Sequence, residues 1–239
     1  MHIITNGDEN RIKTTIKSLD YYNFEYTFHT FKKHPTSGKM GCFLSHIEMY
    51  KYAKDNNLEY ICIAEDNIIE SKINLKKIKK ELHDILSKKW NIIILGGWFI
   101  PFTICKSTSY KYIYNTTSIH GTSCYIIHKK FYSYILKHYI EYQEYHIDYY
   151  LMKEAKKKAF IINPFLFRRN NIIPTTNTYF INSVVDMYYY INCSNIMTKG
   201  WQYFSKNSVF IVLCFVVIIL FIILFILYIQ YDRDKIIIK

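Results

Sequence analysis

A continuous apolar run near the carboxyl end constrains this chain more than any other feature. Every residue from Val209 to Ile229 is apolar or aromatic, a stretch of 21 residues. A helix of this length, rising about 1.5 Å per residue, crosses a hydrocarbon core of roughly 30 Å. A helix inside a globular domain is seldom apolar on all faces over such a length. The sequence therefore predicts one transmembrane helix over 209–229, followed by a short charged tail over 230–239.

The amino terminus suggests how the chain is oriented. Residues 1–9 contain neither a basic stretch nor an apolar one, so we expect no cleavable signal peptide. A single span so close to the carboxyl end favours tail anchoring after translation, with residues 1–207 in the cytosol. The lumenal orientation stays open, because Asn115 and Asn192 lie in glycosylation sequons. N-glycans at these positions would place the domain in the lumen.

The composition indicates a folded domain ahead of the span. Half of the 239 residues are apolar and 18% are aromatic, with seven Gly and four Pro, which excludes a disordered or collagen-like chain. The net charge of +12 comes from short runs such as 76–80 and 156–158. Solvated helix faces explain such runs, and a phosphate or anionic-membrane surface is the alternative. No nucleic-acid partner is expected, because no clustered basic helix or aromatic platform appears.

The cysteines give a weaker constraint. Six are present, at positions 42, 62, 105, 124, 193 and 214, and they form no C-x-x-C pair. We therefore expect reduced thiols in packed positions rather than a disulfide framework or a zinc site.

Short apolar runs alternate with amphipathic segments through the domain. Helices are predicted from Ser45, or one turn earlier, to about Asn56, over 75–86, over 129–142 and over 149–158. Strands are predicted over 60–64, over 91–95 with a stop at Gly96-Gly97, over 123–127 and over 159–162 before Pro164. This alternation favours an α/β layer fold with a largely parallel sheet. We place the domain at 1–170, and a segment without clear periodicity at 171–207.

The most informative stretch follows the strand over 60–64. There Glu65, Asp66 and Asn67 stand at the carboxyl end of a buried strand, the edge where open α/β sheets bind ligands. Adjacent carboxylates repel unless a cation, or a Lys or Arg partner, offsets their charge. Mg²⁺ or Mn²⁺ bridging to diphosphate oxygens fits this chemistry. The alternative is a turn in which Asp66 or Asn67 caps a following helix.

Five other places carry weaker signals. His46 either belongs to a helix terminus or contacts a sugar nucleotide, and His120–Ser123 form either a turn or a metal or phosphate contact. Asp148 is favoured at a helix start by the dipole. The arginines at 168–169 either pair with phosphate or end a strand. The glycines at 96–97 indicate a tight turn, since no G-x-G-x-x-G pattern is present.

Two motifs, Gly38–His46 and residues 60–67, in this order resemble those of glycosyltransferase family 25, the lipooligosaccharide and collagen galactosyltransferase type. The family's Gly-Glu-Ile-Gly-Cys-x-x-Ser-His motif is matched by Gly38–His46, with Lys39 in place of Glu. Its strand with a terminal Glu-Asp-Asp is matched by 60–67, with Asn67 in place of the last Asp.

Further positions extend the resemblance over about residues 1–170. The family's Gly-Thr-x-x-Tyr strand resembles 121–125, and its Asp before a helix resembles Asp148. Asn6, Asp8 and Arg11 resemble its first strand with an Asn-Leu…Arg signature, at a shorter spacing.

The resemblance implies a GT-A-type fold, a UDP-sugar donor carrying galactose or glucose, and a divalent ion, Mn²⁺ or Mg²⁺. The acceptor is a glycan, a lipid-linked molecule or a protein held near the membrane. In an inverting transfer the acceptor hydroxyl attacks the anomeric carbon, a carboxylate takes its proton and the metal holds the leaving diphosphate.

By motif position the resemblance also assigns roles to residues. Metal binding falls to Glu65, Asp66 and Asn67, and catalysis to Asp148 and Asp66, with Asp148 as the base or as a second metal-site carboxylate. Donor contacts fall to Asn6, Arg11, Ser45, His46, Glu65, Gly121 and Thr122.

A catalytically degenerate relative is the alternative function. Asn67 offers a neutral oxygen where the family offers a carboxylate, which weakens metal binding. Such a chain would be a tail-anchored binding or structural protein.

Overall fold

In the computed structural model, the described residues are 1–98, 105–117, 120–155 and 158–170. No helix among them is long and apolar enough to cross a membrane. The predicted span over 209–229, the segment 171–207 and the tail lie outside the described residues.

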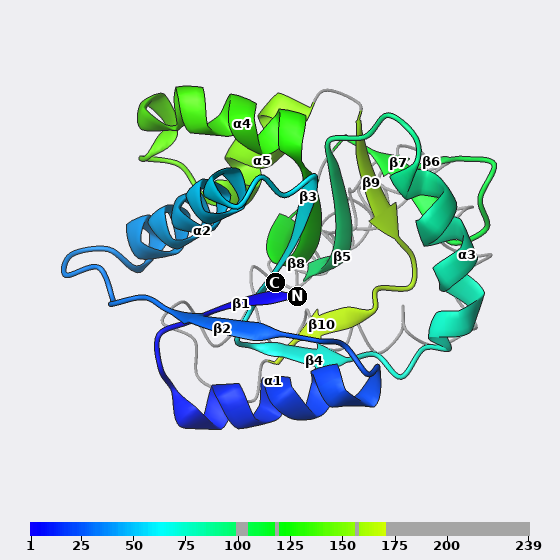
Figure 1. The fold of residues 1–239 in the computed structure, drawn as a ribbon, viewed down its shortest axis with the longest axis horizontal. Coiled ribbons are helices and arrows are strands. Elements are labelled where there is room, and N and C mark those ends of the chain that lie inside the picture. Colours follow the sequence, from blue (N-terminus) through cyan, green and yellow to red (C-terminus); the bar gives the residue numbers. More distant parts are fainter. Residues whose placement is uncertain (99–104, 118–119, 156–157, 171–239) are drawn as a thin grey trace, which may run out of the picture. The chain divides into compact units, whose positions relative to one another are not determined.

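The described residues build a mixed ten-stranded sheet (Figure 1). Its main path runs β2-β1-β3-β8-β5-β9-β7-β6, and β10 joins β5 to β4. The strands are β1 (His2–Thr5), β2 (Thr27–Thr30), β3 (Tyr60–Glu65), β4 (Ile68–Glu70), β5 (Ile92–Trp98), β6 (Cys105–Ser107), β7 (Ile113–Thr116), β8 (His120–His128), β9 (Ala159–Ile162) and β10 (Phe167–Arg169).

Strand direction confirms the expectation of a mostly parallel sheet. β2, β1 and β3 pair in parallel, as do β5 and β9. β8 is antiparallel to both β3 and β5, so these two strands run in the same direction on either side of it. The exceptions on the main path are therefore β8 and β7, and β7 is antiparallel to both β9 and β6.

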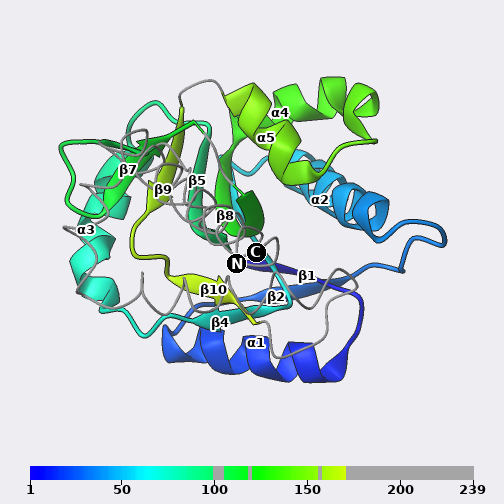
Figure 2. The ribbon, with the colours of Figure 1, turned by 180° about the vertical axis from the view of Figure 1, so that it is seen from behind.

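Helices cover both faces of the sheet (Figures 1 and 2). They are α1 (Glu9–Tyr21), α2 (Gly38–Asp55), α3 (Leu75–Leu86), α4 (Lys129–His138) and α5 (Ile147–Ala155), with a 3₁₀ turn over Tyr139–Tyr142. α1 and α3 share one buried cluster with the sheet, in which Leu19 and Ile78 meet Ile3, Ile93 and Leu95. α2, α4 and α5 pack together over β3 and β8. Both faces of the sheet are covered, as in other α/β folds.

Most of the predicted long elements are confirmed, with corrected boundaries. The helix predicted over 129–142 is α4 followed by the 3₁₀ turn, the helix predicted over 149–158 is Ile147–Ala155, and the strand predicted over 123–127 is His120–His128. Two further corrections have a clear physical reason. α2 begins at Gly38 because Ser37, in extended conformation, caps it by accepting a hydrogen bond from the Met40 N–H. The predicted cap, Ser45, lies inside the helix and donates to the Gly41 carbonyl instead. The other correction is at 96–97, where β5 continues through the glycines to Trp98.

The short strands β2, β4, β6, β7 and β10, along with β1 and α1, have no predicted counterpart in the alternation. Most strands of three or four residues carry too little periodicity to stand out from loops, although the four-residue β9 is a continuous apolar run and was predicted. In α1 the buried residues are Thr15, Ser18 and Leu19, so the helix shows little apolar periodicity.

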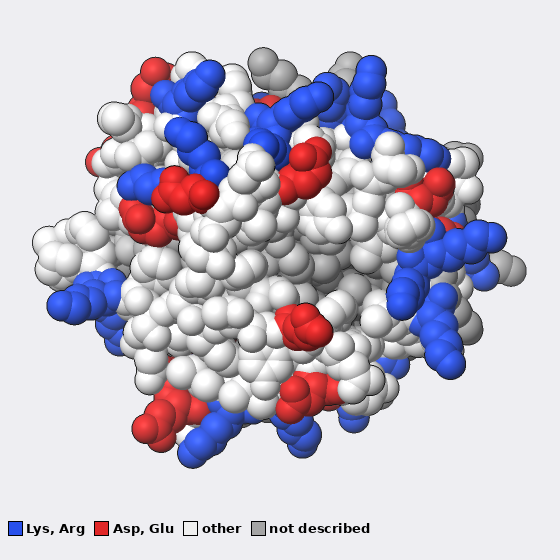
Figure 3. All heavy atoms as spheres, viewed as in Figure 1, with Lys and Arg blue, Asp and Glu red and all other residues white. Residues whose placement is uncertain are grey.

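Surface charge is spread over the part of the domain in view. On the face drawn in Figure 3, Lys and Arg lie around the periphery with Asp and Glu among them. Lys76, Lys79 and Lys80 of α3 are exposed. This run therefore forms a solvated helix face.

Gly96 is required by close packing between strands. A Cβ at this position would lie 2.8 Å from the Phe167 carbonyl oxygen of β10 and 3.2 Å from the Cys124 Cβ of β8. The β5–β8 register also shifts here.

We predict that Gly96→Ala lowers the free energy of unfolding by about 1–3 kcal/mol, because the backbone must move to admit the methyl group. Chemical denaturation measures it, and the exposed Lys80→Ala is the control. Equal stability of the two variants would contradict this role.

A histidine pair joins β1 to β2 beside α2. His2 Nδ1 and His29 Nε2 are 2.9 Å apart, and the Tyr52 ring of α2 lies against both imidazoles. Burial, helped by the neighbouring amino terminus and His29, lowers the pKa of His2 from 6.5 to about 4. Burial also lowers the pKa of His29. Both imidazoles are therefore held in their neutral forms in the folded chain.

This shift predicts a pH dependence of stability. Between pH 6.5 and about 4 the unfolded chain binds a proton at His2 that the folded chain does not. The free energy of unfolding should therefore fall as the pH drops through this window, in addition to the effect of the carboxylates. Denaturation curves at several pH values should give a smaller fall for His2→Gln than for the wild type. His83→Gln, at an exposed position, should show the same fall as the wild type. Identical falls for the wild type and both variants would refute the prediction.

Candidate active site

The carboxyl ends of β1, β2 and β3 open into one cleft of about 780 Å³. Because the three strands are parallel, Thr5, Phe31 and Glu65 arrive at the same edge of the sheet. This is the edge at which ligands bind in open α/β sheets. The first turns of α2 form another wall of the cleft, including Ser37 and Cys42.

Asp66 is held by two partners on the α1 side. The Thr5 hydroxyl donates to Asp66 Oδ2 at 2.6 Å, and Arg11 Nη2 lies 3.1 Å from Asp66 Oδ1. Asp8 caps α1 by accepting from the Asn10 and Arg11 N–H groups, which places Arg11 in the first turn. Burial raises the pKa of Asp66, although Thr5 and Arg11 both favour its charged form. The charge of Asp66 is therefore offset by an arginine, one of the two kinds of partner expected from the sequence.

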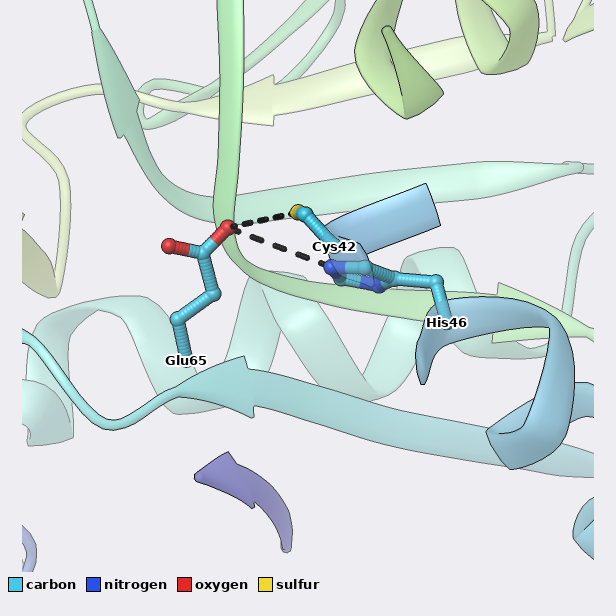
Figure 4. Close-up of side chains that lie close together, drawn as sticks. All are labelled: Cys42, His46 and Glu65. Atoms are coloured by element: carbon cyan, nitrogen blue, oxygen red, sulfur yellow. Dashed lines mark hydrogen bonds and ion pairs between the residues drawn. The ribbon is translucent and has the colours of Figure 1, made fainter. Parts of the chain in front are cut away.

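Glu65 faces the α2 side instead. Its Oε1 lies 3.9 Å from His46 Nε2 and 4.0 Å from Cys42 Sγ (Figure 4). Burial acts to raise the pKa of Glu65, but His46, Arg169 and Arg11 outweigh it and lower the pKa. Burial raises the pKa of the Cys42 thiol, and the charges of Glu65 and Asp148 raise it further. Both cysteine and histidine therefore present their polar atoms to one carboxylate oxygen.

A chain of buried hydrogen bonds fixes His46. Its Nδ1 is 2.6 Å from the Tyr125 hydroxyl of β8, which is 2.6 Å from the Tyr50 hydroxyl. His46 is fully buried and its ring stacks on Tyr125. His46 is thus an interior residue of α2 with one edge at the cleft, and not a helix-terminus residue.

Asp148 lies one residue into α5 and is tied to β8. Its Oδ2 accepts the Gly121 N–H at 2.9 Å, at a glycine with φ of +80°. Thr122, next in β8, is buried. Asp148, Gly121 and Thr122 are not among the residues that line the cleft, whereas the predicted donor contacts Asn6, Arg11, Ser45, His46 and Glu65 are.

The three residues predicted to share Mn²⁺ or Mg²⁺ do not fit such a site. Successive side chains at a strand end point to opposite sides. Glu65 accordingly meets α2, while Asp66 is already bonded to Arg11 and Thr5. Asn67 is buried, its Oδ1 has no hydrogen-bond partner in the described part of the chain, and it does not line the cleft. We therefore derive no step through a manganese or magnesium ion.

Cationic residues also line the cleft, and most of them were not predicted as site residues from the sequence. Arg169 of β10 lines the cleft, so its position is compatible with the predicted phosphate contact. Lys32 and Lys33 after β2 and Lys39 in the first turn of α2 line it too. Lys32 and Lys33 could have been recognised as site residues because they follow the carboxyl end of β2. They were missed because this four-residue strand was not predicted.

Comparisons with known proteins connect this site to a family. The family described as "Glycosyltransferase family 25 (LPS biosynthesis protein)" matches residues 6–152. Procollagen galactosyltransferase 1-B of Xenopus laevis is 36% identical over 63 residues, which is 26% of this chain and 10% of that protein. The chain thus aligns with about a tenth of the length of this relative.

Solved structures give weaker likenesses. A glycosyltransferase involved in glycosylation of the major capsid of PBCV-1 has a TM-score of 0.44 at 10% identity, covering 80% of this chain and 98% of that one. UDP-glucose pyrophosphorylase complexed with UDP-glucose has a TM-score of 0.42 at 13% identity, covering 84% and 81%. The sequence match extends over more than half of the chain and contains Arg11, His46, Glu65 and Asp66. This chain belongs to glycosyltransferase family 25.

Proposed function

We propose that this chain transfers a hexose, galactose or glucose, from a UDP-sugar to a hydroxyl of a glycan, lipid-linked or protein acceptor. The observation that carries the proposal is the cleft at the carboxyl ends of β1, β2 and β3, where cations surround two carboxylates in a family 25 chain. The name of the procollagen galactosyltransferase relative favours galactose.

The charges of the cleft suit a nucleoside diphosphate. Side chains from four segments line it, namely Arg11, Lys32, Lys33, Lys39 and Arg169. Guanidinium groups bind phosphate oxygens with two parallel hydrogen bonds, and lysines add point charge. The cleft also contains the amino terminus of α2, and the first turn of a helix favours an anion through its backbone N–H groups and dipole. These groups would stabilise the charge that develops on the leaving diphosphate.

The proposed transfer inverts the anomeric carbon. The acceptor oxygen forms the new bond to this carbon as the bond to the diphosphate oxygen breaks, and UDP leaves. The hydroxyl proton passes to a carboxylate, for which we propose Asp148 on its motif position within the family 25 match. Asp66 would position Arg11 against the donor.

The predicted span supports a place for this reaction. A membrane anchor over 209–229 would concentrate lipid-linked or membrane-protein acceptors near the domain. We propose a cytosolic domain, with a lumenal one as the alternative that N-glycans on Asn115 or Asn192 would establish.

Arg11 provides the first test. Arg11→Ala should weaken UDP-galactose or UDP-glucose binding by roughly 10–100-fold, the loss of one charged hydrogen-bonding group. The donor affinity of Arg11→Lys should lie between those of the wild type and Arg11→Ala, because lysine keeps the charge and loses the planar guanidinium group. Calorimetric titration of the 239-residue chain measures this, with exposed Lys80→Ala as the control. If wild type and Arg11→Ala bind the donors equally, the cleft is not the donor site.

Asp148 provides the second. Asp148→Asn keeps an oxygen that can accept the Gly121 N–H but cannot take a proton. The rate of sugar transfer, measured as the release of UDP, should fall by roughly 10²–10⁴-fold while donor affinity changes little. Full transfer by Asp148→Asn would leave Asp148 with only the structural role of holding β8.

A degenerate transferase is the second candidate, favoured by the engagement of Asp66 with Arg11 and by the burial of Asn67. It predicts weak or absent donor binding by the wild type, and indifference to Asp66→Ala.

A further inference from the structure

Three metal-binding side chains converge beside the proposed donor site. Cys42 and His46 are four residues apart, so they lie on the same side of α2. Glu65, at the end of β3, faces both of them (Figure 4). Their ligand atoms all lie within 4.8 Å of one another, and no other trio of His, Cys, Asp or Glu in the described ranges meets this condition.

Two of the three separations are close to those in a coordinated trio. Zinc bonds of about 2.0–2.3 Å in a tetrahedron place neighbouring ligand atoms roughly 3.3–3.8 Å apart. The His46 Nε2 to Glu65 Oε1 distance is 3.9 Å, and the Cys42 Sγ to Glu65 Oε1 distance is 4.0 Å. Side-chain shifts of a few tenths of an ångström along these two pairs would therefore suffice.

His46 is oriented as a ligand would be. Tyr125 engages its Nδ1, so the opposite nitrogen, Nε2, is aimed at Glu65. Nε2 is buried and has no hydrogen-bond partner among the described residues. A buried polar atom without a partner is costly unless something else binds it. Metal-bound histidines typically have their second nitrogen fixed in this way by a hydrogen bond.

The donor set selects the class of metal. One sulfur, one imidazole nitrogen and one carboxylate oxygen suit Zn²⁺ and its neighbours, whereas Mn²⁺ and Mg²⁺ favour oxygen ligands. All three residues line the cleft, so a fourth position would face the space where a ligand or water enters.

We propose that Cys42, His46 and Glu65 form a zinc-type site with one open position. On binding, the sulfur–metal bond forms as the thiol proton leaves to solvent, with no redox change. The site does not depend on the proposed sugar transfer.

Cobalt titration tests the site directly. Co²⁺ added to the 239-residue wild-type chain should give a thiolate-to-cobalt charge-transfer absorption in the near ultraviolet at one equivalent, and Zn²⁺ should abolish it. Mn²⁺ at the same concentration should leave the absorption in place. Failure of the wild type to develop this absorption overturns the proposal, and so does its displacement by Mn²⁺.

Variants assign the absorption to this trio. Cys42→Ser should remove it, whereas Cys62→Ser, a free cysteine on β3 outside the trio, should keep it. Tyr125→Phe should retain the absorption but weaken cobalt affinity by roughly 10–100-fold, because the second nitrogen of His46 loses its hydrogen bond. Circular dichroism checks that each variant is folded. An absorption that survives in folded Cys42→Ser belongs to another cysteine and refutes the site.

Discussion

The parallel pairing of β1 with β3 is the constraint on which the site depends. His2 pairs with Ile63 and Ile4 with Glu65, and the Asp66 N–H continues the ladder to the Ile4 carbonyl. This register brings the end of β1 beside the end of β3, although Thr5 and Asp66 are 61 residues apart. A slip by one residue would exchange the faces of every side chain on β3. Glu65 would then turn from α2, and Asp66 from Arg11.

The two neighbouring carboxylates avoid repulsion by pointing in different directions. Asp66 is surrounded by Thr5 and Arg11 on the side of α1, and Glu65 by Cys42 and His46 on the side of α2. The nearly buried Asp66 needs such partners, since an isolated carboxylate in this environment would become protonated. Two chemically distinct halves of one cleft result, one cationic and one containing sulfur and nitrogen. They would suit a phosphate-bearing donor and a softer metal ion respectively.

Sequence patterns predicted the long elements better than their ends. The helix over 75–86 and the strand over 159–162 were predicted with their observed bounds, because the helix repeats apolar residues at helical spacing and the strand is a short apolar run. The start of α2 was predicted too late, since Ser45 and Glu48 have capping-box spacing but Ser37 makes the actual cap. The stop at Gly96 was predicted where a strand continues, because the close approach of Phe167 is invisible along the chain.

The sequence by itself determined the family, the helices α2 to α5, the strands β3, β5, β8 and β9, and the presence of Glu65 and Asp66 at a strand end, because local periodicity and short motifs suffice for these. The structure placed Cys42 and His46 one helical turn apart, because α2 begins at Gly38, earlier than predicted. Only the tertiary structure decided which partner each carboxylate takes. Cys42 and Glu65 are 23 residues apart, and their contact depends on α2 packing against β3 while β1 and β3 keep their register. Such contacts result from cooperative packing of distant segments, which no local pattern encodes.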